Sequence, residues 1–340
     1  MESKKRILEI DITKGLAIIL AVIGHAFPDA MKGFWIAGKD SIAASTESFI
    51  YSFHMPLFFM CSGFLLYTKL SAGGGIFKQV SSRFRRLMIP YLFLSFMYLL
   101  AKMKGGALAA TQLDDNPVVG IVFGNSPCFG AWFLWSLFFI SIIVLSVRKV
   151  NVWIMLLVCF ALSYVQLNLS ETYKGIQSIL SNTLWLVMGC LVRKNYKIIC
   201  ERTGWLQLII SLMIILLIHI YNVVNLDNSI LYRRSLMIIK TLAGISTSFS
   251  LCYIIALKYP QTIVAKCLKI CGDYCMDIYI LSMFVLVPLR LLYVNFEFMN
   301  YIPYWPWIIM ASVLGVIVPI ALSKYVVRKF KLLRILLIGG

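Results

Sequence analysis

The stretch RILEIDITKGLAIILAVIGHAF, residues 6–27, decides how the rest of the chain is interpreted. It has the length and apolar content of a membrane-spanning helix, yet it contains the ionisable residues Asp11, Lys14 and His25. Lys14 and His25 are three helical turns apart, so they share one face at a separation of about 16 Å along the axis. Asp11 precedes Lys14 by one turn and is close enough to pair with it.

An ionisable group inside a membrane costs several kcal/mol unless it is paired or faces a wet cavity. The stripe of Asp11, Lys14 and His25 therefore predicts the polar wall of a cavity that crosses much of the bilayer. A second interpretation stays open. In it, Asp11 and Lys14 neutralise each other at the membrane edge, and His25 is a hydrogen-bonded core residue.

The composition excludes an ordinary soluble protein. Of the 340 residues, 61% are hydrophobic and 14% are charged, and the mean hydropathy is +0.87. Soluble domains are about 45–50% apolar and about 25% charged. In a membrane protein, a net charge of +18 is expected in cytoplasmic loops rather than on a nucleic-acid-binding face. We therefore expect the lipid bilayer as a partner, and no nucleic acid.

The apolar runs predict an all-α, polytopic membrane protein with about ten transmembrane helices. They lie at residues 7–27, 48–68, 87–104, 129–147, 151–167, 176–193, 205–223, 235–257, 272–294 and 302–327. The polar stretches between them are too short for a soluble domain. Residues 1–340 are therefore expected to form a single transmembrane domain.

The orientation follows from the lysine and arginine residues. Most of the 32 fall in alternate segments, on the side of the membrane where the N-terminus lies. Because such residues concentrate on the cytoplasmic side, both termini are expected in the cytoplasm and the protein in the cell membrane. The first run is not expected to be a cleaved signal, since charges interrupt it and no small-residue cleavage site follows.

The nine cysteines show no CxxC pair and no zinc-ligand spacing. Cys267, Cys271 and Cys275 recur at every fourth position, which places them on one helix face. Free cysteine in apolar surroundings behaves as a small hydrophobic residue, so this face is expected to pack. No metal is expected.

A second histidine, His54, lies in the run 48–68 at about the depth of His25 in the first run. Pro56 removes a backbone donor and bends the helix, which leaves a carbonyl near His54 able to bond. Neutral imidazole is a good general base near neutral pH. Two histidines at matched depth favour a catalytic pair, whereas a kinked structural helix remains the alternative.

Three further sets of residues are candidates. Ser62 and Gly63 allow close helix packing, and they also leave room for a narrow acyl-pantetheine arm. Arg83 and Arg86 share a face at the cytoplasmic end of the third run, where they either anchor the helix or clamp phosphate groups. An outer group either faces an anionic acceptor or snorkels to lipid head groups. It comprises His219, Arg233, Arg234, Lys240 and Arg290.

Together these residues resemble the acyltransferase-3 family of integral membrane acyltransferases, in particular its fucose 4-O-acetylase-like branch. Four segments carry the resemblance: DITKGLAIILAVIGH from Asp11 to His25, FIYSFHMPLFFMCSGFL at 49–65 with its SGFL motif, the R-x-x-R of Arg83 to Arg86, and AWFLWSLFF at 131–139. The first preserves the family's basic residue, ten intervening residues, and histidine. The chain departs from the family in GDYCMDIYILSMFV at 272–285, where Ser282 stands in place of a histidine and Cys275 in place of a serine.

The resemblance implies transfer of an acetyl group from cytoplasmic acetyl-CoA to a hydroxyl of a surface carbohydrate or lipid-linked glycan. In that interpretation His25, with His54 and Asp11, forms the catalytic group, and His25 acts as general base or acyl carrier. Lys14, Arg83, Arg86, Ser62 and Gly63 bind the donor. A transporter or flippase for a sugar or lipid-linked glycan is the main alternative, and a non-catalytic sensory domain is another. CoA release coupled to glycan acetylation separates the first from the others.

Overall fold

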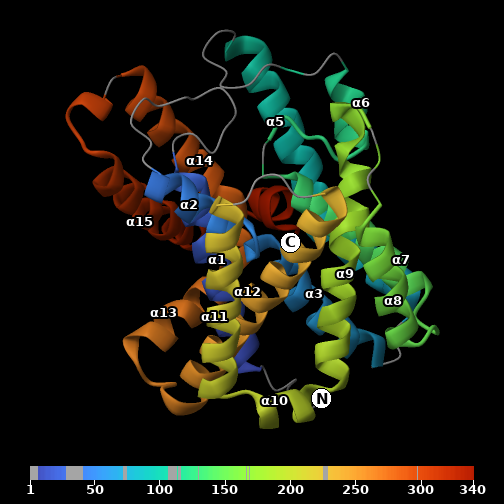
Figure 1. Ribbon diagram of the computed structural model, residues 1–340. Coiled ribbons are helices and arrows are strands. Elements are labelled where there is room, and N and C mark those ends of the chain that lie inside the picture. Colours follow the sequence, from blue (N-terminus) through green and yellow to red (C-terminus); the bar gives the residue numbers. More distant parts are fainter. Residues whose placement is uncertain are drawn as a thin grey trace.

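A computed structural model of the chain describes residues 7–27, 41–71, 75–105, 113, 116–128, 130–165, 167, 169–224, 229–296 and 298–340. The described residues form helices and connecting turns, with no strand among them (Figure 1). The N-terminal half contains α1 Leu8–Ala26, α2 Ser41–Tyr51, α3 His54–Ser71, α4 Ile76–Arg83, η1 Phe84–Met88, α5 Ile89–Gly105, α6 Pro117–Val122, α7 Trp132–Ser146 and α8 Val152–Ser163.

The C-terminal half is built in the same way, with the 3₁₀ turns η3 and η4 and the π-helical turns η5 and η6 between its α-helices. It contains η3 Glu171–Tyr173, α9 Lys174–Lys194, α10 Tyr196–Arg202, α11 Trp205–Val224, α12 Ile230–Lys258, α13 Ile263–Asp273, α14 Cys275–Asn295, η4 Phe298–Asn300, α15 Tyr304–Leu322, η5 Ser323–Val327, α16 Lys331–Leu333 and η6 Arg334–Ile338. The prediction of an all-α, polytopic membrane protein is confirmed.

The number of spanning helices is lower than the ten expected. By length and composition, six helices of the described chain are able to cross a membrane, or seven if the pair α10 and α11, bent by 87°, is one span. The first run carries Glu9, Asp11 and Lys14, and α7 and α8 have only 15 and 12 residues. Because a straight span needs about 20 apolar residues, apolar runs in the sequence overcounted the spans.

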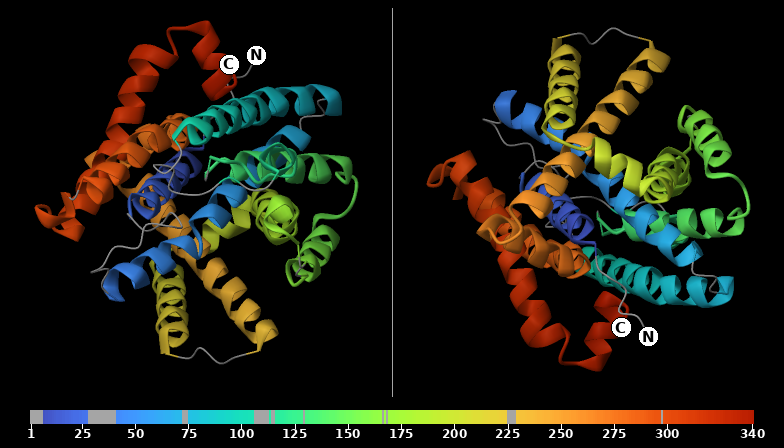
Figure 2. Two further views of the ribbon diagram at one scale, coloured as in Figure 1. Left: turned by 90° about the horizontal axis from the view of Figure 1, so that it is seen from above. Right: turned by 90° about the horizontal axis from the view of Figure 1, so that it is seen from below.

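Helix α1 is the central helix of the bundle. It packs against α2, α3, α12, α13, α14 and α15, and both views along the vertical axis show it surrounded by later helices (Figure 2). Two glycines make its contact with α13 a close one, since a Cβ at Gly15 or Gly272 would overlap a backbone carbonyl of the other helix. Small residues at such a crossing are a common feature of helix packing in membranes.

A second close crossing joins α3 and α9. A Cβ at Gly63 would overlap the carbonyl oxygen of Leu186, and a Cβ at Gly189 would overlap that of Met60. The Cys190 thiol donates to the carbonyl of Gly63 over 3.4 Å. Neither glycine position has room for a larger residue, so these two helices are held backbone to backbone.

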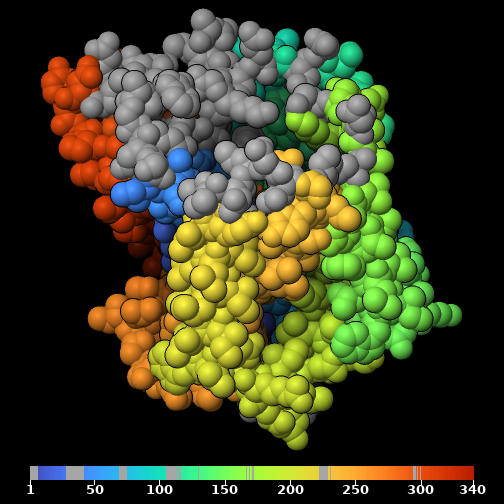
Figure 3. Space-filling model, in the orientation of Figure 1, coloured from blue at the N-terminus to red at the C-terminus, as the bar shows by residue number. Residues whose placement is uncertain are grey.

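The outer face of the molecule is apolar where α11 lies. Figure 3 shows α11, in yellow, standing on the surface of the molecule. Large apolar side chains are exposed along it, at Leu206, Ile209, Met213, Leu217 and Ile220. A helix with such a face in contact with solvent would be unusual in a soluble protein, and it matches a helix that contacts lipid.

Candidate functional site

The break between α2 and α3 exposes backbone groups next to His54. Pro56 has no N–H to donate to the carbonyl of Ser52, and the hydroxyl of Thr241 on α12 bonds that carbonyl instead, over 2.8 Å. The His54 side chain turns back on its own chain, with Nδ1 at 2.9 Å from the carbonyl of Ile50. The expected carbonyl near His54 that bonds outside its own helix is therefore present, at Ser52.

The structure brings the two histidines together. The ring centroids of His25 and His54 are 6.5 Å apart and the rings are nearly perpendicular, and both side chains are buried. Since a carbonyl accepts only, His54 must carry its proton on Nδ1, which leaves the lone pair on Nε2. His25 and His54, expected at matched depth in two apolar runs, are thus direct neighbours in space.

Tyr51 orients His25. Its hydroxyl lies 3.1 Å from Nδ1 of His25 and donates to the carbonyl of Gly24 over 3.4 Å. Both bonds are satisfied when His25 carries its proton on Nδ1, and Nε2 then bears the lone pair. Sequence analysis missed Tyr51. It precedes His54 by three residues, about one helical turn, and this spacing could have suggested that the two side chains lie near each other.

The C-terminal end of α1 is held by a buried arginine. Arg290 on α14 is 3% exposed, and its Nη2 donates to the carbonyl of His25 over 2.6 Å. The last carbonyls of a helix lack partners within it, and a cation there is favoured by the helix dipole. Arg290 therefore fixes the turn that carries His25, and its burial shows that it does not snorkel to lipid.

Both histidines line one cavity of about 680 Å³, which we call the histidine cavity. Its other described lining residues are Tyr51, Ser52, Met55, Pro56, Gly130, Trp132, Ser163, Ser181, Asn182, Trp185, Arg233, Arg234, Met237, Ile238, Thr241 and Tyr279. Short hydroxyl and amide side chains together with two tryptophans suit a sugar, which presents hydroxyl groups and an apolar ring face. The outer group of the sequence analysis is therefore not one site. Arg233 and Arg234 line the histidine cavity, whereas His219 and Lys240 do not.

His219 and Lys240 form a separate buried cluster between α2, α11 and α12. Lys240, which is 4% exposed, places Nζ 2.8 Å from Nδ1 of His219. The hydroxyl of Ser45 lies 2.7 Å from Nε2 of the same ring. Snorkelling of Lys240 to lipid is excluded by this burial, and the cluster joins three helices away from either cavity.

A second cavity, of about 810 Å³, is rich in positive charge, and we call it the basic cavity. Its described lining residues are Lys14, Phe58, Cys61, Ser62, Leu65, Thr68, Ser82, Arg83, Arg86, Leu87, Phe133, Leu137, Gly272, Asp273, Cys275, Met276, Asp277, Tyr279, Arg328, Arg334, Ile338 and Gly340. Five cations and two carboxylates line it, so it favours an anionic ligand. Four of the five residues expected to bind the donor lie here: Lys14, Ser62, Arg83 and Arg86.

The remaining expected site residues lie beside these cavities. Gly63 packs against α9 and does not line the basic cavity. Asp11 is paired with Lys14 at 2.7 Å, about 21 Å from His25 along α1. The structure therefore places Asp11 with the basic cavity and not with the histidines.

Three arginines that line the basic cavity lie in or directly next to π-helical turns. The described chain has three π-helical turns, η1, η5 and η6; η1 contains Arg86, η6 begins at Arg334, and η5 ends next to Arg328. Such turns widen a helix locally and are frequent at functional sites. The guanidinium of Arg83 donates to Ser141 on α7 over 2.9 Å.

The C-terminal segment contributes two arginines that sequence analysis treated as ordinary positive-inside residues. Arg328 pairs with the buried carboxylate of Asp277 at 3.0 Å and lies over the ring of Tyr274 at 4.5 Å. The hydrogen bonds with Asp277 raise the pKa of Arg328 above its ordinary value. The side chain of Arg334 lines the cavity and forms no hydrogen bond or ion pair with any described residue, so it is available to an anion.

Ser282, at the place of the family's late histidine, is buried and donates to the carbonyl of Tyr279 over 3.3 Å. It lines neither cavity. Within the described residues, no group of histidine, cysteine, aspartate and glutamate side chains is arranged to hold a metal ion.

The sequence matches the family described as Acyltransferase domain (Acyl_transf_3) over residues 7–324, which is nearly the whole chain. The chain belongs to the acyltransferase-3 family. Two similar proteins carry the name Nodulation protein NolL. The one from Mesorhizobium japonicum is 29% identical over 189 residues, and the one from Sinorhizobium fredii is 27% identical over 181 residues.

The matches to these two relatives are partial. They cover 50% and 49% of this chain, and 44% of the length of each relative, so the chain spans less than half of the curated relatives that it matches. No solved structure gives a significant match. Membership of the acyltransferase-3 family therefore rests on the family match, and the site geometry described above is this chain's own.

Proposed function

We propose that the protein is an O-acyltransferase that moves an acetyl group from acetyl-CoA to a hydroxyl of a carbohydrate or lipid-linked glycan. The observation that carries this proposal is the pair of cavities. One is basic and suits the phosphates of CoA, the other holds two neighbouring histidines and sugar-compatible side chains, and both are lined by Tyr279. Membership of the acyltransferase-3 family supports the reaction type.

The donor binds in the basic cavity in this scheme. The side chains of Arg86 and Arg334 line this cavity and form no hydrogen bond or ion pair with other described residues. Guanidinium groups bind phosphate through two parallel hydrogen bonds. Lys14, held by Asp11, continues the positive charge toward the centre of the bundle. Asp11 is then a positioning residue for Lys14 rather than a member of the catalytic group.

The acceptor hydroxyl meets the thioester in the histidine cavity. His25 accepts the proton of the hydroxyl on Nε2 while the oxygen attacks the acyl carbon. The C–O bond of the ester forms, the C–S bond breaks, and the proton passes to the sulfur, which leaves as CoA thiol. If His25 instead carries the acyl group, the same bonds form and break in two steps. His54, with its Nε2 lone pair, assists proton transfer.

Acetyl-CoA is cytoplasmic, so the basic cavity faces the cytoplasm. The C-terminal segment lines that cavity through Arg328 and Arg334, so in this scheme it lies on the cytoplasmic side together with most of the lysine and arginine residues. We propose the orientation expected from the charge distribution, with both termini in the cytoplasm of a cell-membrane protein.

The deciding experiment uses the purified chain in proteoliposomes with acetyl-CoA and membrane glycans of the cell that makes the protein. We expect release of CoA thiol, and a mass increase of one acetyl group on the glycan, both dependent on the protein. Translocation of unmodified glycan without CoA release would establish the transporter alternative instead, and binding without either event would establish a sensory role.

A further inference from the structure

The two cavities meet at one residue. Tyr279 on α14 lines both the histidine cavity and the basic cavity, and it is the single described residue common to their linings. Its side chain is only 6% exposed. An acyl group that starts in the basic cavity and ends beside His25 therefore has to pass the ring of Tyr279.

The ring of Tyr279 is held in place from two directions. Its hydroxyl donates to the backbone carbonyl of Gly130, which lines the histidine cavity. Its ring packs edge to face with that of Phe133 on α7, with ring centroids 5.4 Å apart. Both contacts are made by residues at the start of α7. The ring, which is carried by α14, is therefore held in position by α7.

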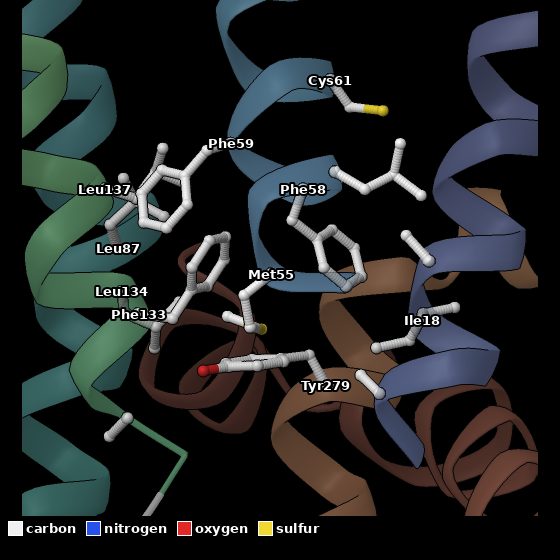
Figure 4. Close-up of a cluster of buried hydrophobic side chains, with 14 of the residues drawn as sticks. Ile18, Met55, Phe58, Phe59, Cys61, Leu87, Phe133, Leu134, Leu137 and Tyr279 are labelled. Atoms are coloured by element: carbon white, nitrogen blue, oxygen red, sulfur yellow. The ribbon is translucent and has the colours of Figure 1, made fainter. Parts of the chain in front are cut away.

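Helix α3 completes a layer around Tyr279. Met55 lines the histidine cavity and Phe58 lines the basic cavity one turn further along the same helix. Phe58 also contacts Phe133, with centroids 5.8 Å apart. Figure 4 shows Met55, Phe58, Phe133 and Tyr279 as one apolar cluster between α3, α7 and α14. We call these four residues the apolar layer.

We propose that Tyr279 determines the size of the acyl group that the protein transfers. This inference rests on the proposed function, because it concerns the path between the donor and the acceptor. When the thioester reaches His25, its acyl carbon chain lies beside the apolar layer. Packed protein interiors leave few voids larger than a water molecule. A short acyl group is therefore accommodated beside the apolar layer, whereas a longer one collides with the ring of Tyr279.

The test compares acetyl-CoA with butyryl-CoA as donors, each with a labelled acyl group, in vesicles from membranes of the cell that makes the protein. The membrane glycans serve as acceptor. Tyr279→Ala removes the ring, and Tyr279→Phe keeps the ring but removes its bond to Gly130. Tyr293 supplies the matched controls Tyr293→Ala and Tyr293→Phe. It is a buried tyrosine of the same helix whose hydroxyl also donates to a backbone carbonyl, that of Ile302, and it lines neither cavity.

The measured quantity is kcat/KM for butyryl transfer divided by kcat/KM for acetyl transfer. We expect Tyr279→Ala to raise this ratio by about tenfold or more, since a single methylene in an apolar pocket is worth roughly 10–200-fold in discrimination. Tyr279→Phe should raise it less, and both Tyr293 variants should leave it unchanged. An unchanged ratio in Tyr279→Ala, or an equal rise in Tyr293→Ala, overturns the inference.

If Tyr279→Ala does not accumulate in the membrane, Met55→Ala decides, because it opens the apolar layer from α3. A rise of the ratio supports the inference and an unchanged ratio overturns it. The proposed function fails separately, since in that case the wild-type protein transfers no acyl group from either donor.

Discussion

Nη2 of Arg290 lies 2.6 Å from the backbone carbonyl oxygen of His25. The two residues come from α14 and α1, helices that are far apart in the sequence. Because the bond is to the backbone, it fixes the height and rotation of the last turn of α1, and with it the imidazole. A histidine that serves as base has to be placed within a fraction of an ångström.

We therefore predict that Arg290→Lys lowers kcat for acetyl transfer by about tenfold or more, with little change in the KM for acetyl-CoA. Lysine keeps the charge but lacks the second arm of the guanidinium group. Steady-state kinetics in proteoliposomes measure the two constants separately. A proportional change in KM, or loss of folded protein without loss of specific activity, would show that Arg290 has a structural role only.

His25→Gln should abolish acetyl transfer while the protein still inserts into the membrane. Glutamine keeps much of the size and the hydrogen bonding but accepts no proton near neutral pH, and loss of a general base costs about 10²–10⁴-fold. His219→Gln is the matched control, since His219 is a buried, hydrogen-bonded histidine outside both cavities. Activity is measured per amount of protein in the membrane, and wild-type rates in His25→Gln would remove His25 from the reaction.

Donor affinity should depend on Arg86 and Arg334. Replacing either by alanine should weaken acetyl-CoA binding by about 1.5–3 kcal/mol, the contribution of a hydrogen bond to a charged group, or roughly 10- to 150-fold in Kd. Arg85 lies next to Arg86 in η1 and does not line the basic cavity, so Arg85→Ala should bind normally. Calorimetric titration with acetyl-CoA measures these affinities, and equal effects at positions 85 and 86 would indicate a general charge effect.

Gly63→Ala should reduce stability rather than donor affinity. The added methyl group overlaps the carbonyl of Leu186, and overpacking of this kind typically costs about 1–3 kcal/mol. Gly204→Ala is the control, because nothing lies within 4 Å of a Cβ there. Thermal unfolding of the detergent-solubilised protein should show a lower Tm for Gly63→Ala alone. A normal Tm with weakened donor binding would return Gly63 to the donor site.

Orientation can be tested by labelling single cysteines in a chain that lacks the nine native ones. Gly204→Cys follows α10, and Val118→Cys lies on α6 at the opposite end of the molecule (Figure 1). We expect an impermeant thiol reagent to label position 118 on intact cells and position 204 only after permeabilisation. The reverse pattern would place the basic cavity outside and would contradict the use of cytoplasmic acetyl-CoA.

The helical class of the fold and the pairing of His25 with His54 were predictable, because both follow from patterns along single helices. The number of spans was not, since apolar content does not reveal that α7 and α8 are too short to cross a bilayer. Ser62 and Gly63 show a finer limit. They are adjacent in one motif, but consecutive helix positions point about 100° apart, so one faces the basic cavity and the other faces α9.

Residues whose roles depend on distant segments escaped prediction for a different reason. Arg334 has the same sequence context as any arginine near a cytoplasmic end, and only the packing of the C-terminal segment against α5 brings it to the basic cavity. Arg290 likewise has the charge of a lipid-contacting residue until its burial is known. The local sequence shows which interactions a side chain is able to form, whereas tertiary packing determines which residues it contacts.

The apolar layer of Met55, Phe58, Phe133 and Tyr279 has a consequence for the cell's energy supply. A passage that lets an acyl group reach the far side of a membrane also offers protons and sodium ions a way through, and such a leak would discharge the membrane potential. Ions are costly to place among apolar side chains, so a layer of this kind is expected to insulate the two cavities electrically from each other.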